Sequence, residues 1–150
     1  MKEKLVFLLL ISLFCSCVDD TSKKETKYLA NIIDQSNIIN KQYRWIVILP
    51  GTGCHGCIQE GEYFLKNNID NDEILFVLTK LASLKILQQK IEVDDLSKRQ
   101  NVYVDKNKEF FIPSHNNIYP CVIYLKNGRF LRHSFQSSIS TALYDLEKEL

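Results

Sequence analysis

Residues 45–57, WIVILPGTGCHGC, decide the predicted fold. They begin with five apolar residues, Trp45 to Leu49, which end at the turn-forming pair Pro50-Gly51. A continuous apolar run of this length, bounded by proline and glycine, is typical of a strand buried on both faces of a sheet. After a short glycine-containing loop come Cys54 and Cys57, and apolar residues then recur at helical spacing, at Ile58, Phe64, Leu65 and Ile69. The stretch therefore predicts a buried strand, a loop and a helix through about residue 69 that starts at a CxxC motif.

The position of the two cysteines predicts thiol chemistry. The amide N–H groups in the first turn of a helix have no acceptor within the helix, and the helix dipole is positive there. This environment would stabilise a thiolate at Cys54 and lower its pKa. Cys54, nearer the exposed end, could then attack a disulfide, and Cys57, one turn deeper, could resolve the mixed disulfide. We therefore expect a redox-active dithiol.

Two other roles for the pair stay open. The cysteines could form a static structural disulfide. They could also bind a metal ion, although a closed zinc site takes four ligands and the chain has no second CxxC motif. His115, Cys121 and His133 would have to converge on the pair to complete such a site, and we predict no metal.

The other elements are predicted from apolar spacing and turn residues. Residues 27–40 and 81–92 each carry a helical stripe of Leu and Ile. Residues 74–78 predict a second buried strand and residues 102–104 a short strand, while 105–118 is expected to be an irregular connection.

The last third of the chain predicts a hairpin and a closing helix. Pro120 precedes the strand-like run 121–125, and an Asn-Gly pair separates that run from residues 130–135. Asn-Gly between two such runs is the strongest short hairpin signal, because both central turn residues need a positive φ. A closing helix, capped by Ser137 or Ser138, is predicted from the spacing of Ile139, Ala142, Leu143, Leu146 and Leu150.

The order of these elements predicts one α/β domain over residues 27–150. A strand–helix–strand unit followed by a hairpin and a final helix favours a mixed central sheet with helices on both faces. The composition agrees, because 45% of the 150 residues are hydrophobic and 25% are charged, an ordinary globular balance.

The chain resembles the thioredoxin-fold thiol–disulfide oxidoreductases over about residues 42–150. The resemblance rests on the apolar strand before the motif, on CHGC at 54–57, and on YPCVIYLKNGR at 119–129. In that family a cis proline packs beside the CxxC motif, and a hairpin comes next. The resemblance implies a thioredoxin-like three-layer sandwich with a cis peptide bond before Pro120. It also assigns Tyr119 and Pro120 to the substrate-binding groove.

The resemblance further implies the partners of the protein. Members of the family exchange disulfides with protein thiols, depend on a redox partner protein, and use no organic cofactor. His55 between the two cysteines would, when protonated, favour the thiolate and make the pair more oxidising; it could equally be an exposed side chain without effect. Cys121 could be a third redox thiol, although such a cysteine is more often a small buried hydrophobic residue.

This sequence departs from the family pattern at several positions. Gly53 stands where a tryptophan usually precedes the first cysteine, and Gly56 stands where proline is common. The strand at 45–49 contains no acidic residue, so the buried proton acceptor of many members is missing or comes from elsewhere. The spacing between the motif and the proline is longer than the family minimum, which places an insertion within 81–118.

The N-terminus predicts a lipoprotein signal. A short charged start is followed by about ten apolar residues, too few for a permanent bilayer span of about 20 residues. Ser16-Cys17 then resembles the lipobox of bacterial lipoproteins, in which the chain is cut before the cysteine and the cysteine is acylated. We expect a signal peptide at 1–16, lipidation at Cys17 and a polar flexible tether at 17–26. An uncleaved anchor, plain secretion and a buried N-terminal strand or helix are the alternatives.

Together these features predict a lipid-anchored thiol–disulfide oxidoreductase of the bacterial cell envelope, on the periplasmic side of the inner or outer membrane. Nucleic-acid binding is not expected, because 19 basic and 18 acidic residues leave a formal net charge of only +1. The alternatives are a non-catalytic binding module with a structural disulfide and a copper or zinc carrier.

Overall fold

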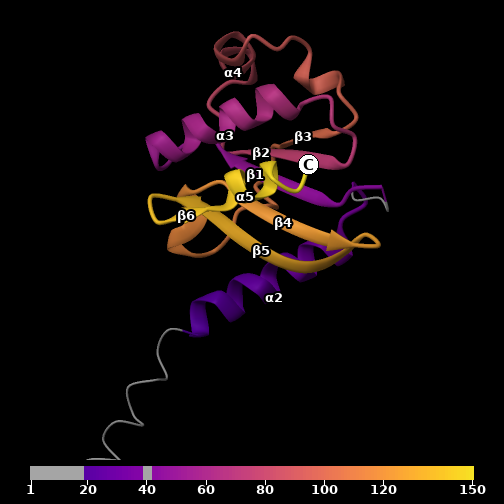
Figure 1. The fold of residues 1–150 in the computed structure, drawn as a ribbon, viewed down its shortest axis with the longest axis vertical. Helices are drawn as coiled ribbons and strands as arrows, with labels where there is room; N and C mark the ends of the chain where they lie inside the picture. Colours follow the sequence, from indigo (N-terminus) through magenta and orange to yellow (C-terminus); the bar gives the residue numbers. More distant parts are fainter. Residues whose placement is uncertain (1–18, 39–41) are drawn as a thin grey trace, which may run out of the picture.

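A six-stranded mixed sheet forms the centre of the molecule (Figure 1). The computed structural model describes residues 19–38 and 42–150. The strands lie in the order β3-β2-β1-β4-β5-β6. Their bounds are β1 Trp45–Pro50, β2 Ile74–Thr79, β3 Val102–Asp105, β4 Cys121–Lys126, β5 Arg129–Ser137 and β6 Ser140–Thr141. The helices are α2 Asp19–Gln35, α3 His55–Asn68, α4 Leu84–Ile91 and α5 Ala142–Glu147.

The central strand β1 joins two differently built halves of the sheet. It pairs in parallel with β2 and antiparallel with β4, where Ile48 lies opposite Cys121. β2 continues the parallel half to β3, and β4 forms the predicted hairpin with β5. The turn of that hairpin has Asn127 and Gly128 at φ values of 54° and 76°, which confirms the Asn-Gly prediction.

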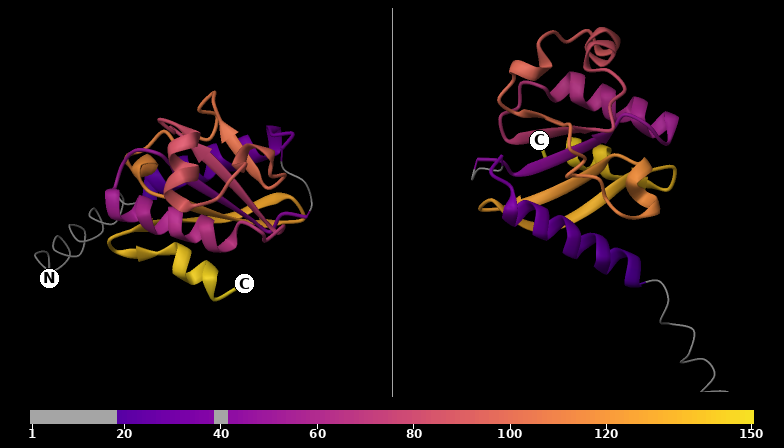
Figure 2. Two further views of the ribbon diagram at one scale, coloured as in Figure 1. Left: turned by 90° about the horizontal axis from the view of Figure 1, so that it is seen from above. Right: turned by 180° about the vertical axis from the view of Figure 1, so that it is seen from behind.

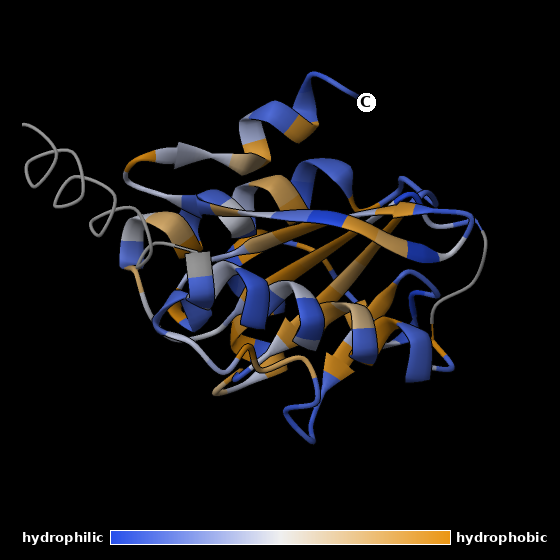
Figure 3. Cartoon of the chain, turned by 90° about the horizontal axis from the view of Figure 1, so that it is seen from below, coloured by the Kyte–Doolittle hydropathy of each residue, from blue (hydrophilic) through white to orange (hydrophobic). Residues whose placement is uncertain are grey.

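Helices cover both faces of the sheet, so every residue of β1 and β2 is buried. In Figures 1 and 2, α2 lies against one face, and α3, α4 and α5 lie on the other. Alternate residues of β1 enter two hydrophobic clusters, Val47 on the α3 face and Ile48 on the α2 face. Figure 3 shows the mostly hydrophobic strands in the interior of the molecule and helices that alternate hydrophilic and hydrophobic residues around them. The predicted α/β class, with a mixed sheet and helices on both faces, is confirmed.

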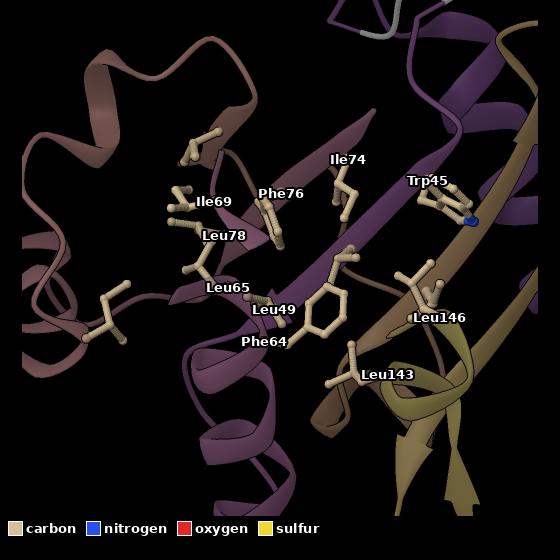
Figure 4. Packing of buried hydrophobic residues seen from close by; sticks show 14 of the residues in the cluster. Trp45, Leu49, Phe64, Leu65, Ile69, Ile74, Phe76, Leu78, Leu143 and Leu146 are labelled. Carbon is tan, nitrogen blue, oxygen red and sulfur yellow. The ribbon is translucent and has the colours of Figure 1, made fainter. Parts of the chain in front are cut away.

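Figure 4 shows the cluster on the α3 face. Phe64 of α3 lies beside Leu143 of α5 there. The rings of Phe64 and Phe76 pack with centroids 6.3 Å apart. Trp45 is also part of this core, with 2% of its surface exposed. Because α3 is anchored by this packing, the start of the helix is held at a fixed place beyond the end of β1.

The N-terminal helix is longer on its N-terminal side than predicted. α2 begins at Asp19 and ends at Gln35, so the prediction of a flexible tether through residue 26 is wrong for residues 19–26. Leu29 and Ile33 are buried against the sheet as expected, but Glu25, one turn earlier, is also buried, with 3% exposed. The tertiary contacts of Glu25 extend the ordered helix toward the N-terminus.

The closing helix is shorter than predicted. β5 continues to Ser137 and turns back into β6, so Ser137 and Ser138 do not cap a helix. Ile139 lies in that turn and is 95% exposed. The N-cap position of α5 is Thr141, and the buried face of the helix consists of Ala142, Leu143 and Leu146. The pairing of β5 with β6 therefore replaces the first turn of the expected helix.

The segment between β2 and β4 contains the remaining elements. α4 begins after Ser83, whose hydroxyl accepts a hydrogen bond from the Ile86 amide at 3.3 Å. The helix predicted over 81–92 is therefore three residues shorter at its start. Two 3-10 turns, Leu96–Lys98 and His115–Ile118, lie within the stretch. The second of these turns leads directly to Pro120 and β4.

Candidate functional site

The structure joins Cys54 and Cys57 in a disulfide at the junction of β1 and α3. Their Cα atoms are 5.4 Å apart. Cys54 is the N-cap residue of α3 and is half-buried, whereas Cys57 lies in the first turn with 5% of its surface exposed. Cys54, which was predicted to lie nearer the exposed end, is thus the more exposed of the two cysteines.

The electrostatic surroundings of Cys54 are those of a helix N-terminus. The amides of His55, Gly56 and Cys57 belong to the first turn, whose N–H groups have no acceptor within the helix. No acidic residue lies in this turn. The first regular helical hydrogen bond is donated by the Ile58 amide to the Cys54 carbonyl, at 2.9 Å. A thiolate at Cys54 would therefore face unpaired N–H groups and the positive end of a helix of 14 residues.

The loop before Cys54 is held by its backbone. The Cys54 amide donates a hydrogen bond to the Ile118 carbonyl at 3.1 Å. Gly53 has a φ of 148°, and a Cβ atom there would clash with the backbone of Ile118. This contact explains why a glycine occupies position 53. Gly56 differs, because a Cβ atom there would have nothing within 4 Å.

The resemblance implied that Pro120 packs beside the CxxC motif, and the structure shows Pro120 against Gly61 of the same helix, α3. Pro120 is buried, and its Cγ lies 3.2 Å from the position that a Cβ atom on Gly61 would occupy. The expectation of a cis bond before Pro120 is wrong, because the described residues contain no cis peptide bond. Tyr119 is extended, with φ −108° and ψ 146°, which is the ordinary conformation before a trans proline.

Tyr119 lies at the end of β1, on the side away from Pro120 and α3. It is half-buried and lines a small cavity with Pro50 and Phe111. Its amide donates to the Asn116 carbonyl at 3.0 Å and closes the 3-10 turn. The structure therefore places Pro120, rather than the Tyr119 ring, against the cysteine-bearing helix.

Cys121 is a free cysteine that is fully buried. It belongs to the hydrophobic cluster on the α2 face, together with Ile48 and Leu29. Burial raises the pKa of its thiol far above the ordinary value, and the nearby carboxylate of Glu25 raises the pKa further. These surroundings disfavour a thiolate at Cys121 and support its role as a small buried hydrophobic residue.

The three histidines have different surroundings. His55 and His115 are exposed. His133 has only 8% of its side chain exposed, and its Nε2 lies 3.6 Å from Oε2 of Glu25. Burial lowers the pKa of His133, and the Glu25 carboxylate opposes part of this shift.

The residues considered for a metal site do not meet. Among residues 19–38 and 42–150, no group of three or more His, Cys, Asp or Glu side chains could hold a metal ion. Cys121 lies in the cluster on the α2 face, and His133 pairs with Glu25.

Glu25 is a part of this region that the sequence analysis missed. Its Oε1 accepts hydrogen bonds from the Ser114 hydroxyl at 2.5 Å and from Nδ2 of Asn116 at 2.8 Å. Ser114 and Asn116 flank the start of the 3-10 turn that ends at Ile118, whose carbonyl binds the Cys54 amide. A charged residue four positions before Leu29, in line with the apolar stripe of a helix, is the sequence signal that could have revealed it.

The predicted lipidation site, Cys17, lies outside the described residues. No helix within the described ranges is both long enough and apolar enough to cross a membrane. Comparison of the chain with known protein families, with curated proteins and with solved structures finds no match.

Proposed function

We propose that the protein is a thioredoxin-like thiol–disulfide oxidoreductase that exchanges disulfides with protein substrates through Cys54 and Cys57. The observation that carries this proposal is the position of the pair. A buried strand ends at Pro50, shortly before the pair, and Cys54 is the N-cap residue of α3, whose first-turn amides have no acceptor within the helix. Pro120 packs against the same helix. No organic cofactor is needed, because the two thiols carry the electrons.

The reaction in the reducing direction has two steps. The Cys54 thiolate attacks one sulfur of a substrate disulfide, the substrate S–S bond breaks, and one substrate sulfur leaves as a thiolate. Cys57 then loses its proton and attacks the Cys54 sulfur of the mixed disulfide. The Cys54–Cys57 disulfide forms, and the second substrate sulfur leaves. Two electrons pass from the protein to the substrate, and a redox partner protein restores the dithiol.

We also propose that the protein works in the bacterial cell envelope, anchored through an acylated Cys17. The support is the N-terminal sequence, with its short apolar run and Ser16-Cys17. Labelling of cells with a fatty acid should mark the wild-type protein and not the Cys17→Ser variant. Equal labelling of both would contradict the anchor without affecting the redox proposal.

Reduction of insulin by dithiothreitol tests the enzymatic proposal. Wild-type protein should accelerate insulin precipitation, and the Cys54→Ser/Cys57→Ser double variant should not. The Cys57→Ser variant should accumulate a mixed disulfide at Cys54, and the Cys54→Ser variant should not. If wild type is no faster than the double variant, and its reduction potential lies below about −300 mV, the pair is a structural disulfide instead.

A further inference from the structure

The face between α3 and α5 carries a groove of about 630 Å³. Its floor includes Phe64 and Leu143, which are each 4% exposed. Each wall carries one exposed tyrosine, Tyr63 on α3 with 70% exposure and Tyr144 on α5 with 61%. Large aromatic side chains that stay in water over an apolar floor are typical of a binding site.

The charge of the groove is negative. Glu60 and Glu147 line it, and within the described residues the lining includes no Lys, Arg or His. The hydrogen-bond donors to these carboxylates are neutral amides, Gln136 to Glu60 at 2.6 Å and Asn68 to Glu147 at 3.2 Å. A ligand that combines an apolar group with a positive charge therefore complements the groove. Lys148, whose Nζ lies 4.0 Å from the centroid of the Tyr144 ring, shows that a cation already stacks on this aromatic surface.

Gln136 connects the groove to Pro120 and to the cysteine-bearing helix. The amide of Gln136 donates to the Pro120 carbonyl at 2.8 Å. Its side chain donates to Glu60 of α3, and its Oε1 accepts from the Leu143 amide of α5 at 3.0 Å. Gln136 therefore contacts Pro120 through its backbone, and its buried side chain joins the cysteine-bearing helix to the opposite wall of the groove.

The groove also lies close enough to Cys54 for one extended substrate segment to reach both. Tyr63 is nine residues further along the chain, which corresponds to about 14 Å along a helix at 1.5 Å per residue. An extended peptide covers that distance in about four residues. A substrate whose cysteine meets Cys54 would thus present its fourth residue to the two tyrosines.

We propose that this groove binds an extended segment of the substrate protein, in which a large apolar residue next to a Lys or Arg lies about four positions from the reacting cysteine. The proposal rests on the function proposed above and adds a substrate preference to it. The two tyrosines and the apolar floor hold the apolar side chain, and Glu60 and Glu147 pair with the basic one.

The test uses the full-length protein with short peptide disulfides as substrates. One peptide carries Phe-Lys four positions from its cysteine, a second carries Phe-Glu there, and a third carries Ser-Lys. We expect kcat/KM to be highest for the Phe-Lys peptide. In the Tyr63→Ser/Tyr144→Ser variant, kcat/KM for the Phe-Lys peptide should fall about tenfold. The Glu147→Gln variant should lose its preference for the Phe-Lys peptide over the Phe-Glu peptide.

Matched controls separate this proposal from the general redox function. Exchange with a small aromatic disulfide, which does not reach the groove, should be unchanged in both groove variants, Tyr63→Ser/Tyr144→Ser and Glu147→Gln. The Ile86→Ser variant, which removes a similarly exposed apolar side chain on α4 (63% exposed), should behave as wild type on every peptide. Failure of the wild type with the small disulfide would refute the proposed function itself.

The groove proposal fails under three results. Equal kcat/KM values for the three peptides would overturn it while leaving the redox function intact. A tyrosine-dependent dimer in sedimentation would identify a second copy of the chain as the occupant. Competition by a small quaternary ammonium ion, with no dependence on the peptide sequence, would identify a small organic cation instead.

Discussion

Gly53 shows how a single residue determines the shape of the site. Its φ of 148° and its close approach to Ile118 leave no room for a Cβ atom. Any side chain at this position would strain the backbone and displace the carbonyl that binds the Cys54 amide. Compared with the family that the sequence resembles, glycine at position 53 is unusual. The close approach of Ile118 gives a physical reason for it.

We predict that Gly53→Ala lowers the free energy of unfolding by about 1–3 kcal/mol, because the variant combines backbone strain with a steric clash. Urea denaturation measures the change. Gly56→Ala is the matched control, since a Cβ atom there meets nothing within 4 Å and alanine favours a helix over glycine. An equal loss in both variants would show that the Ile118 contact is unimportant.

We expect His133 to make the stability of the protein depend on pH. Burial lowers its pKa in the folded protein, so the unfolded chain binds the proton more strongly. The contribution of neutral His133 is therefore fully present above its ordinary pKa of about 6.5 and is lost as the pH falls through the lower folded value. The Glu25 carboxylate, which faces His133, opposes only part of this effect.

We predict that the His133→Gln variant loses less stability than the wild type between pH 7 and pH 5. Urea midpoints at several pH values measure how steeply the stability changes with pH. The His115→Gln variant, changed at an exposed position, should show the same pH dependence as the wild type. A steeper slope for His133→Gln would mean that the ion pair with Glu25, rather than burial, dominates.

Among the elements, α2 has an effect beyond its own packing. Glu25 connects it to Ser114 and Asn116, which are 89 and 91 residues away in the chain. The 3-10 turn that these residues begin ends at Ile118, which binds the Cys54 amide. A helix on the opposite face of the sheet from α3 thus supports the loop that precedes the disulfide.

We predict that Glu25→Ala lowers the free energy of unfolding by about 1–3 kcal/mol, because two polar side chains lose their buried acceptor. Hydrogen exchange should also show reduced protection of the Cys54 amide. Asp34→Ala, at an exposed position of the same helix, should change neither quantity. If Glu25→Ala leaves the Cys54 amide as protected as in the wild type, α2 does not support the site.

Which elements the sequence predicts depends on how local their signals are. The strands β1 and β2, the start of α3 and the Asn-Gly hairpin are encoded by short apolar runs and turn residues, and the structure confirms them. The start of α2 depends on partners distant in the chain, and the exposure of Ile139 depends on the pairing of β5 with β6. Local spacing can flag a residue such as Glu25, but it does not identify the distant partners that the residue contacts, so both predictions failed.

At the scale of the whole molecule, the sheet topology determines where the site lies. The disulfide follows the carboxyl end of β1, the strand at which the parallel and antiparallel halves of the sheet meet. In open α/β sheets, binding sites gather at the carboxyl ends of strands where the connections diverge. The order of predicted elements was sufficient to place the two cysteines there, whereas Glu25 and the groove between α3 and α5 required the three-dimensional structure.

The reactivity of Cys54 tests the central claim most directly. The rate of alkylation of the reduced protein by iodoacetamide is measured against pH, with Cys54→Ser as the control that identifies the reacting thiol and with Cys121 protected by burial. If the helix N-terminus stabilises the thiolate, the midpoint of the Cys54 reaction lies between about pH 3.5 and 7.5. A midpoint near 8.5, the value of an unperturbed cysteine, would contradict the account.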